Sequence, residues 1–239
     1  MRQWRRRCAG RSPSPSVVQG PWKHRRVGVS AAPRLPPSAR ASGCRDWLAP
    51  VPDVGYGRAT VEAAPLLPTG LLRCPLVSPG ERFPFVAPDA VAFGSREPAG
   101  RAEDFAALMQ GVAYLERLCF DCLDLLGAPT DGTVVLTGGA TRTPVWNQLR
   151  ADVLRRPLSL PRRAQPALGM AVLAASACGA PGGLDGAAAA MVRPGRVLEP
   201  RSAHRSVHDE GYARLLDLLV QRGWRPETVS AHARERTAP

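Results

Sequence analysis

The amino-acid sequence predicts an α/β fold with a partly parallel sheet over residues 61–224. Three observations carry this prediction: an apolar stripe at helical spacing over residues 102–126, a β-branched run at 133–137 that ends in two glycines, and alternating helical and extended segments after it. Apolar residues three and four positions apart indicate one face of a helix, whereas a short apolar run between turn residues indicates a strand. Alternation of the two is typical of α/β domains.

The strongest helix prediction falls on residues 102–126. Gly127 follows this segment, at the place where a helix end favours a left-handed residue. The segment holds about three heptads, too few to favour an isolated coiled coil, so we expect the helix to lie against a sheet. Its stripe comprises Phe105, Leu108, Val112, Leu115, Cys119, Cys122 and Leu126.

The segment TVVLTGGATRTPVWNQL, residues 133–149, predicts a strand, a glycine corner and a second helix. Gly138 and Gly139 follow the strand. Thr143 is suited to the N-cap of the helix, and Pro144 is suited to its first position, where the proline φ is already preset.

Weaker signals complete the predicted body. A short strand is expected near residues 71–76, followed by an ordered loop that Phe83 and Phe85 anchor. The second helix should end before Pro157 because proline cannot continue it. The remaining expected elements are a strand at 158–160, a helix of small residues at 166–179 and an amphipathic helix at 209–224.

Residues 1–60 are expected to form a disordered leader, and residues 225–239 a flexible tail. The leader is rich in Arg, Pro, Ser, Gly and Ala without a sustained period, which is typical of disorder. It shares an Arg- and Ser-rich, acid-poor composition with transit peptides, but its prolines oppose the amphipathic helix that such a peptide needs. A mistaken start or a frame change in a GC-rich gene gives the same composition.

The formal net charge of +12 belongs mostly to the leader. Residues 1–50 hold 11 of the 32 basic residues and one of the 20 acidic residues, which leaves 21 and 19 for residues 51–239. A basic tail attracts polyanions weakly and without sequence preference. The sequence has no recognition motif or interleaved aromatic residues that would indicate a specific nucleic-acid partner.

Lys23 is the single lysine of the chain, and it lies in the leader. The body therefore has no Walker lysine, no Schiff-base lysine and no kinase-type lysine that pairs with ATP, so backbone amides or arginines would have to hold a nucleotide. No apolar stretch is long enough to span a membrane or to serve as the core of a signal peptide. Six irregularly spaced cysteines favour a reduced, cytoplasmic protein.

Two pairs of side chains resemble metal or redox motifs only superficially. Cys119 and Cys122 form a C-x-x-C, but both fall on the apolar stripe and no second pair follows, which favours core packing over metal or redox chemistry. His204 and His208 lie four apart in HRSVH, which lacks the glutamate of a zinc-protease helix and adjoins a loop-like, Arg-rich stretch. The sequence alone therefore predicts no metal site.

The Gly138–Gly139 corner has two interpretations on the residues alone. Glycine allows a positive φ and a tight reversal, and many such corners bind nothing. Where Cβ is missing, however, the backbone can also approach a ligand closely, and the N-terminus of the following helix attracts an anion.

The wider sequence resembles one family, the FGGY carbohydrate kinases, which include xylulokinase and glycerol kinase. LTGGATRTPVWNQLRADVLRRPLSLPRRAQPALGMAVLAA, residues 136–175, is similar to the nucleotide-binding C-terminal lobe, and ALGMA within it is similar to the family's ALGAA. GERFPFVAPDA, residues 80–90, resembles the family's Gly-Glu-Arg-x-Pro loop. LMQGVAYLERLCFDCLDLLG, residues 108–127, resembles a helix that usually reads EGVAF…LG.

The resemblance implies the C-terminal lobe of the ribonuclease H-like (actin-like ATPase) fold for residues 61–224. It also implies transfer of the γ-phosphoryl group of ATP, with Mg²⁺, to a sugar or polyol hydroxyl. Carried over to this sequence, it places Gly138, Gly139 and Ala140 along the phosphates and ribose of ATP, and Thr143 at a position that contacts nucleotide in some members. The fold holds phosphate largely through backbone amides and Mg²⁺, which is consistent with the missing lysine.

The sequence departs from the family in its N-terminal part. No segment matches the lobe that carries the first phosphate loop, most sugar contacts and the catalytic aspartate. Asp131 is interpreted as a turn residue and Asp152 as an exposed helix residue, both structural, so no general base is assigned. We therefore expect a kinase chain that lacks the N-terminal lobe. The alternatives are a non-catalytic nucleotide-binding module, one half of a split kinase, or a polyanion binder acting through the leader.

The expected partners follow from the same resemblance. They are a nucleotide and, where an N-terminal lobe is supplied, a sugar or polyol; that lobe or a second copy of the chain would be the protein partner. Apolar surface should lie exposed where the missing lobe would pack.

Overall fold

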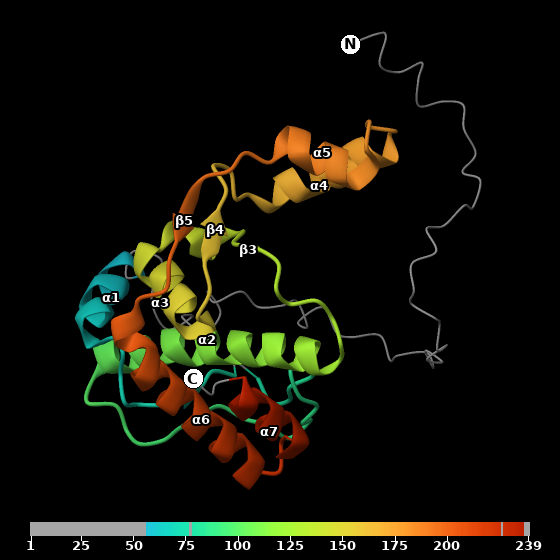
Figure 1. Cartoon of the computed structure of the whole chain (residues 1–239). Coiled ribbons are helices and arrows are strands. Elements are labelled where there is room, and N and C mark those ends of the chain that lie inside the picture. Colours follow the sequence, from blue (N-terminus) through green and yellow to red (C-terminus); the bar gives the residue numbers. More distant parts are fainter. Residues whose placement is uncertain (1–55, 77, 226, 237–239) are drawn as a thin grey trace.

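The computed structural model describes residues 56–76, 78–225 and 227–236, and Figure 1 shows a mixed α/β body that surrounds one long helix. The strands are short and the sheet is small. The helices are α1 (Tyr56–Ala63), α2 (Arg101–Leu125), α3 (Pro144–Leu154), α4 (Pro166–Ala177), α5 (Gly183–Met191), α6 (Arg205–Gln221) and α7 (Glu227–Glu235), with 3₁₀ turns η3 (Ala64–Leu66), η4 (Gly139–Arg142) and η5 (Ser202–His204). The strands are β1 (Arg73–Cys74), β2 (Phe93–Gly94), β3 (Val134–Val135), β4 (Leu158–Leu160) and β5 (Arg196–Leu198).

Helix α2 organises the body because α1, α3, α7 and β1 all pack against it. Phe105, Met109 and Leu118 are buried along its length, together with small residues on the neighbouring faces. The buried face only partly matches the predicted stripe: Phe105 and Cys122 are buried, its other members as far as Cys119 are half-buried, and Leu126, expected at its end, is 74% exposed. Gly127 has a φ of +78° directly after the helix, which confirms the predicted helix end.

The larger sheet has the order β3-β4-β5 and is partly parallel, as predicted. Strand β3 runs parallel to β4, with Val134 opposite Leu158, and β5 runs antiparallel to β4, with Leu198 opposite Leu158. Leu158 and Leu198 form a small apolar cluster with Ala151 and Leu154 of α3. This packing sets the direction of α3 relative to the strand that precedes it. Strands β1 and β2 form a separate antiparallel pair.

The loop between β1 and β2 is ordered by its own backbone. Glu81 and Ala87 exchange two N–H···O hydrogen bonds, of 2.9 and 3.0 Å, which close the loop. Phe85 is buried in the main core, whereas Phe83 is 49% exposed. Only one of the two aromatic anchors expected from the sequence therefore holds the loop to the body.

The structure corrects both predicted ends of the domain. Residues 56–60, assigned to the leader, begin helix α1; residues 1–55 lie outside the described part of the chain, as does the basic charge that they carry. The predicted flexible tail over 225–239 is wrong for Glu227–Glu235, which forms α7 and packs on α2 and α6. Its buried residues are the small Ser230 and Ala233, and His232 also contacts Asp124 of α2, so no apolar period marks the helix in the sequence.

Helices α4 and α5 pack on each other and project from the end of the sheet (Figure 1). Met170, Leu173 and Leu184 are each more than half exposed on this pair. The described residues thus expose apolar surface of the kind expected for a contact with further protein. None of the described helices combines the length and the apolar character needed to cross a bilayer.

Substituting Gly111 by alanine should destabilise the protein because α2 lies against β1 at this position. A Cβ there would lie 2.0 Å from the Arg73 carbonyl oxygen, so the helix or the strand would have to move. We expect a loss of about 1–3 kcal/mol in the free energy of unfolding, measured by urea denaturation.

Gly169→Ala in α4 is the matched control, since a Cβ at that position meets nothing within 4 Å. It should raise stability by about 0.5–1 kcal/mol through helix propensity alone. Equal effects of the two substitutions would contradict the described contact between α2 and β1.

Candidate functional site

The glycine corner connects β3 to α3 through a left-handed residue and a 3₁₀ turn. Gly138 has a φ of +89°, a conformation that L side chains rarely adopt. Its N–H donates to the Ala164 carbonyl at 2.7 Å, which ties the corner to the loop after β4. Its own carbonyl accepts from the N–H and the hydroxyl of Thr141, at 3.3 and 2.6 Å. The chain therefore reverses direction at Gly138 in a fixed geometry.

The start of α3 agrees with the sequence prediction. Thr143 is the N-cap, with extended φ and ψ of −105° and 96°, and Pro144 is the first helical residue. Asn147, which sequence reasoning missed, donates from its side-chain amide to the Thr141 carbonyl at 2.8 Å and so holds the turn against the helix. The sequence contains one signal for this role of Asn147, which is that a polar residue follows the apolar Trp146.

Asn147 also brings an acceptor to the corner. Its side chain is only 2% exposed, and its Oδ1 has no hydrogen-bond partner within the described part of the chain. A buried amide oxygen without a donor is costly, and such groups in native structures are often completed by water or by a ligand.

The corner is open on its outer side. A Cβ built on Gly138 or on Gly139 would meet nothing within 4 Å, so neither glycine is required by close packing of the chain's own atoms. The positive φ of Gly138 explains why glycine stands at that position. Gly139, in the following η4 turn with Ala140, has no positive φ that would require glycine. The positive end of the α3 dipole lies directly behind this turn. The arrangement is suited to a ligand that brings negative charge close to the backbone.

Two acids flank the corner in the sequence, Asp131 before β3 and Asp152 in the last turn of α3. Asp131, interpreted from the sequence as a turn residue, is exposed in the segment before β3. Asp152, predicted to be an exposed helix residue, is instead 2% exposed, and this correction has a clear cause. Arg201 donates to its carboxylate from Nε and Nη2, at 2.9 and 2.6 Å, and also from its backbone N–H, at 2.8 Å. The Asp152 carboxylate is therefore buried and held by Arg201.

His208 lies close to Asp152 and is also buried. Burial lowers the pKa of its imidazole to about 4, so the ring is neutral at neutral pH. Its Nδ1 lies 3.4 Å from the hydroxyl of Tyr114 on α2. His204, at the end of η5, places its Nδ1 3.8 Å from the nearer oxygen of Asp152. The two histidines of HRSVH thus converge with a carboxylate that the sequence does not place beside them.

The cysteine pair has the properties of core residues. Burial raises the pKa of the Cys119 thiol to about 12 and also raises that of Cys122, so both thiols are protonated at neutral pH. The Cys122 thiol donates to the Pro84 carbonyl at 3.4 Å. Protonated, partly buried thiols are poor nucleophiles and poor metal ligands, which agrees with the packing role predicted for them.

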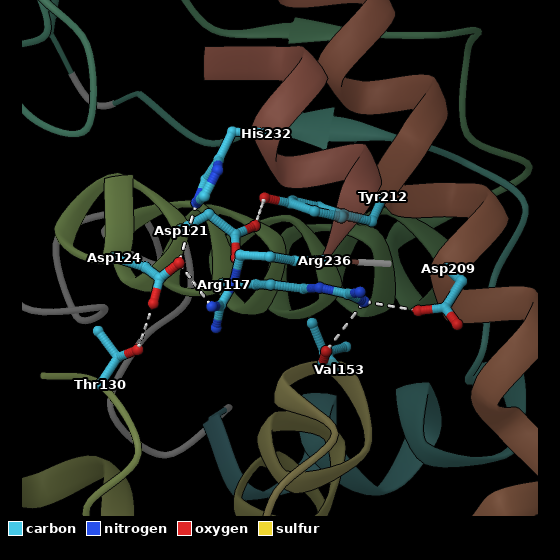
Figure 2. A network of polar contacts seen from close by, with 9 residues as sticks. All are labelled: Arg117, Asp121, Asp124, Thr130, Val153, Asp209, Tyr212, His232 and Arg236. Carbon is cyan, nitrogen blue, oxygen red and sulfur yellow. Dashed lines mark hydrogen bonds and ion pairs between the residues drawn. The ribbon is translucent and has the colours of Figure 1, made fainter. Parts of the chain in front are cut away.

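A polar pocket of about 620 Å³ lies at the opposite end of α3 from the corner. Figure 2 shows its side chains largely paired: Arg117 with Asp209 and the Val153 carbonyl, and Arg236 with Asp121 and Asp124. Because its arginines already have acceptors, this pocket offers an anion less charge than its composition indicates. Its lining comprises Arg117, Phe120, Asp121, Asp124, Ala128, Pro129, Thr130, Asp131, Leu154, Arg155, Arg156 and Arg236.

Comparison with known proteins assigns the family. Residues 55–178, just over half of the chain, match the model of the C-terminal domain of the FGGY family of carbohydrate kinases. The chain therefore belongs to this family, and its described part has the α/β fold of that C-terminal lobe. This confirms the resemblance inferred from the sequence.

Individual relatives agree with the assignment. A human FGGY carbohydrate kinase domain-containing protein is 29% identical over 116 residues, which cover 48% of this chain and 21% of that protein. The xylulose kinase of Rhodospirillum rubrum superposes with a TM-score of 0.59 at 30% identity, covering 73% of this chain and 36% of that one. Plasmodium falciparum glycerol kinase, solved with ADP, shares the fold with a TM-score of 0.56 at 20% identity, over 74% of this chain and 36% of that one. The chain thus spans about a third or less of these relatives.

Gly138→Ala should destabilise the protein by about 1–3 kcal/mol, because alanine would be held at a φ of +89°. Gly139→Ala is the neighbouring control and should change stability by less than about 0.5 kcal/mol, since its Cβ enters open space. Chemical denaturation of both variants measures the difference. If Gly139→Ala is the more destabilising change, the described corner geometry is wrong.

Proposed function

We propose that this chain provides the nucleotide-binding lobe of an ATP-dependent carbohydrate kinase. The observation that carries the proposal is the open Gly138–Gly139 corner, which lies inside the family-matched residues and at the N-terminus of α3. A family member solved with ADP supports the choice of nucleotide as ligand. A cytoplasmic setting, where ATP is available, belongs to the same proposal.

The corner would hold ATP mainly through its backbone. Gly138 sets the turn, Gly139 and Ala140 provide backbone without bulky side chains, and Thr143 begins the helix whose positive end faces the turn. The buried Asn147 Oδ1 is an acceptor available to a donor group of the nucleotide. Mg²⁺ would arrive with the phosphates of ATP, and we assign no carboxylate of the described residues to it.

The chain would supply only the nucleotide side of the reaction. Phosphoryl transfer needs the acceptor hydroxyl and the γ-phosphoryl group held in line, and electrostatic stabilisation of the charge between them. We assign no general base to the described acids, so the acceptor and its base would come from an N-terminal lobe. We expect this chain alone to bind ATP without phosphorylating a sugar or polyol.

An exposed surface formed by β3, α4 and α5 favours a chain that works with a second lobe, either as half of a split kinase or as part of a larger one. Strand β3 is at the edge of its sheet, and Val135 on it is 49% exposed. An edge strand presents backbone groups that another strand can pair with. Together with the apolar side chains exposed on α4 and α5, this edge would form the contact with the complementing lobe.

Gly139→Val should weaken binding of ATP or ADP by at least about tenfold, equivalent to about 1.4 kcal/mol, by filling the space next to the bound phosphates. Isothermal titration calorimetry on the full chain measures the affinity. Gly132→Val is the matched control, because Gly132 lies before β3 and its Cβ also meets nothing within 4 Å. The control should bind nucleotide as the wild type does.

Three results would contradict the proposal: no nucleotide binding by the wild type, equal binding by wild type and Gly139→Val, or equal loss in both valine variants. The first would leave the corner as a purely structural turn. The second would place the nucleotide elsewhere, and the third would show that the loss is not specific to the corner.

A further inference from the structure

Three side chains from three different elements converge on one point between α3 and α6. They are Asp152 of α3, His204 of η5 and His208 of α6, and one donor atom from each lies within 4.8 Å of the other two. Helices α3 and α6 pack against each other, which brings these residues together although 52 positions separate Asp152 from His204. The cluster lies in the last turn of α3, about 13 Å along the helix from Thr143, so it is separate from the nucleotide corner.

Two nitrogens of the cluster are buried without a partner. Nδ1 of His204 and Nε2 of His208 have no hydrogen bond to any described residue, and both atoms are inaccessible to solvent. His208 as a whole is 1% exposed. Buried imidazole nitrogens normally have a hydrogen bond or a metal, so two vacant ones beside a carboxylate indicate a missing ligand.

The surrounding contacts orient these atoms toward one another. The Tyr114 hydroxyl lies 3.4 Å from Nδ1 of His208, and that contact leaves Nε2 as the nitrogen that faces the cluster. Oδ1 of Asp152 accepts from the Gln148 side-chain amide at 3.0 Å and from the Arg201 backbone N–H at 2.8 Å, which leaves Oδ2 facing His204. Metal-binding histidines and carboxylates are typically held by such outer contacts.

We propose that Asp152, His204 and His208 form a binding site for a divalent transition-metal ion of the Zn²⁺ class. Two imidazole nitrogens and one carboxylate oxygen are the donor set that zinc accepts, and a water molecule would complete a tetrahedral shell. Donor atoms in such a shell lie about 3.4 Å apart. His204 Nδ1 and Asp152 Oδ2 are 3.8 Å apart and the three donor atoms lie within 4.8 Å of one another, so the imidazole side chains would turn inward to close the site.

Arg201 competes for the same carboxylate oxygen. Its Nε and Nη2 donate to Oδ2 of Asp152 at 2.9 and 2.6 Å, and a cation at the site would displace this guanidinium. The Arg201 side chain is 51% exposed, so it can turn to solvent at little cost, whereas the buried carboxylate cannot move. The ion would then join α3, η5 and α6 in place of the arginine.

The test is a Zn²⁺ titration of the full chain against a chromophoric chelator. We expect binding that depends on these residues, weakened at least about tenfold by His204→Ala. Arg201→Gln should strengthen binding, because it removes the competing charge and keeps the backbone N–H on Oδ1. A purely structural role for the Arg201–Asp152 ion pair would not give that gain. His204 is chosen for removal because it is partly exposed, whereas His208 is buried in the core.

Two controls separate this site from His232 and from the C-x-x-C. His232→Ala removes a histidine that pairs with Asp124 elsewhere, and the double change Cys119→Ser and Cys122→Ser removes the C-x-x-C. Both variants should bind Zn²⁺ with the affinity of the wild type. Co²⁺ substituted for Zn²⁺ should give the visible bands of a tetrahedral site without a thiolate charge-transfer band. The proposal is overturned if His204→Ala binds as the wild type does, if the cysteine variant loses the ion, or if the wild type shows no saturable binding.

Discussion

Helix α2 buries charged side chains whose partners lie on other helices. Arg117 is 6% exposed; its guanidinium donates to the Val153 carbonyl at 3.2 Å and to Asp209 at 2.8 Å, and it lies 4.5 Å from the centre of the Tyr212 ring. Asp121, one turn further, accepts from the Tyr212 hydroxyl at 2.5 Å (Figure 2). Buried charges that lose a partner are strongly destabilising, so α3 and α6 must meet α2 in one register.

This constraint also positions the corner. The Val153 carbonyl is at the C-terminal end of α3, and the Arg150 guanidinium of the same helix pairs with Glu116 of α2. With that end fixed on α2, the N-terminus of α3 is fixed as well, because a helix of three turns is rigid over its length. Gly138 and Asn147 then hold the turn against a helix that does not move. A backbone site for phosphate needs this kind of rigid support, since its donors cannot adjust individually.

The sequence predicts those features of the structure that depend on neighbouring residues, and it does not predict those that depend on residues far apart in the chain. The start of α3 at Pro144, the end of α2 before Gly127 and the strand Leu158–Leu160 follow from capping and turn chemistry, which acts between near neighbours. The burial of Asp152 could not be predicted, because its partner Arg201 is 49 residues away and both side chains are polar. Helix α7 was missed because it packs through small residues rather than an apolar stripe. At the candidate site the corner was predictable from its glycines, whereas the role of Asn147 arises from the folded turn.

The central claim is that the Gly138–Gly139 corner, rather than the arginine-lined pocket, is the place where a nucleotide binds. Amide NMR spectra of the full chain recorded during addition of ADP test this claim directly, because each backbone N–H reports its own surroundings. A nucleotide at the corner should cause the largest shifts at residues 138–143 and at the side-chain amide of Asn147. Shifts confined to the residues around Arg155 and Arg236, or no shifts at saturating ADP, would contradict it.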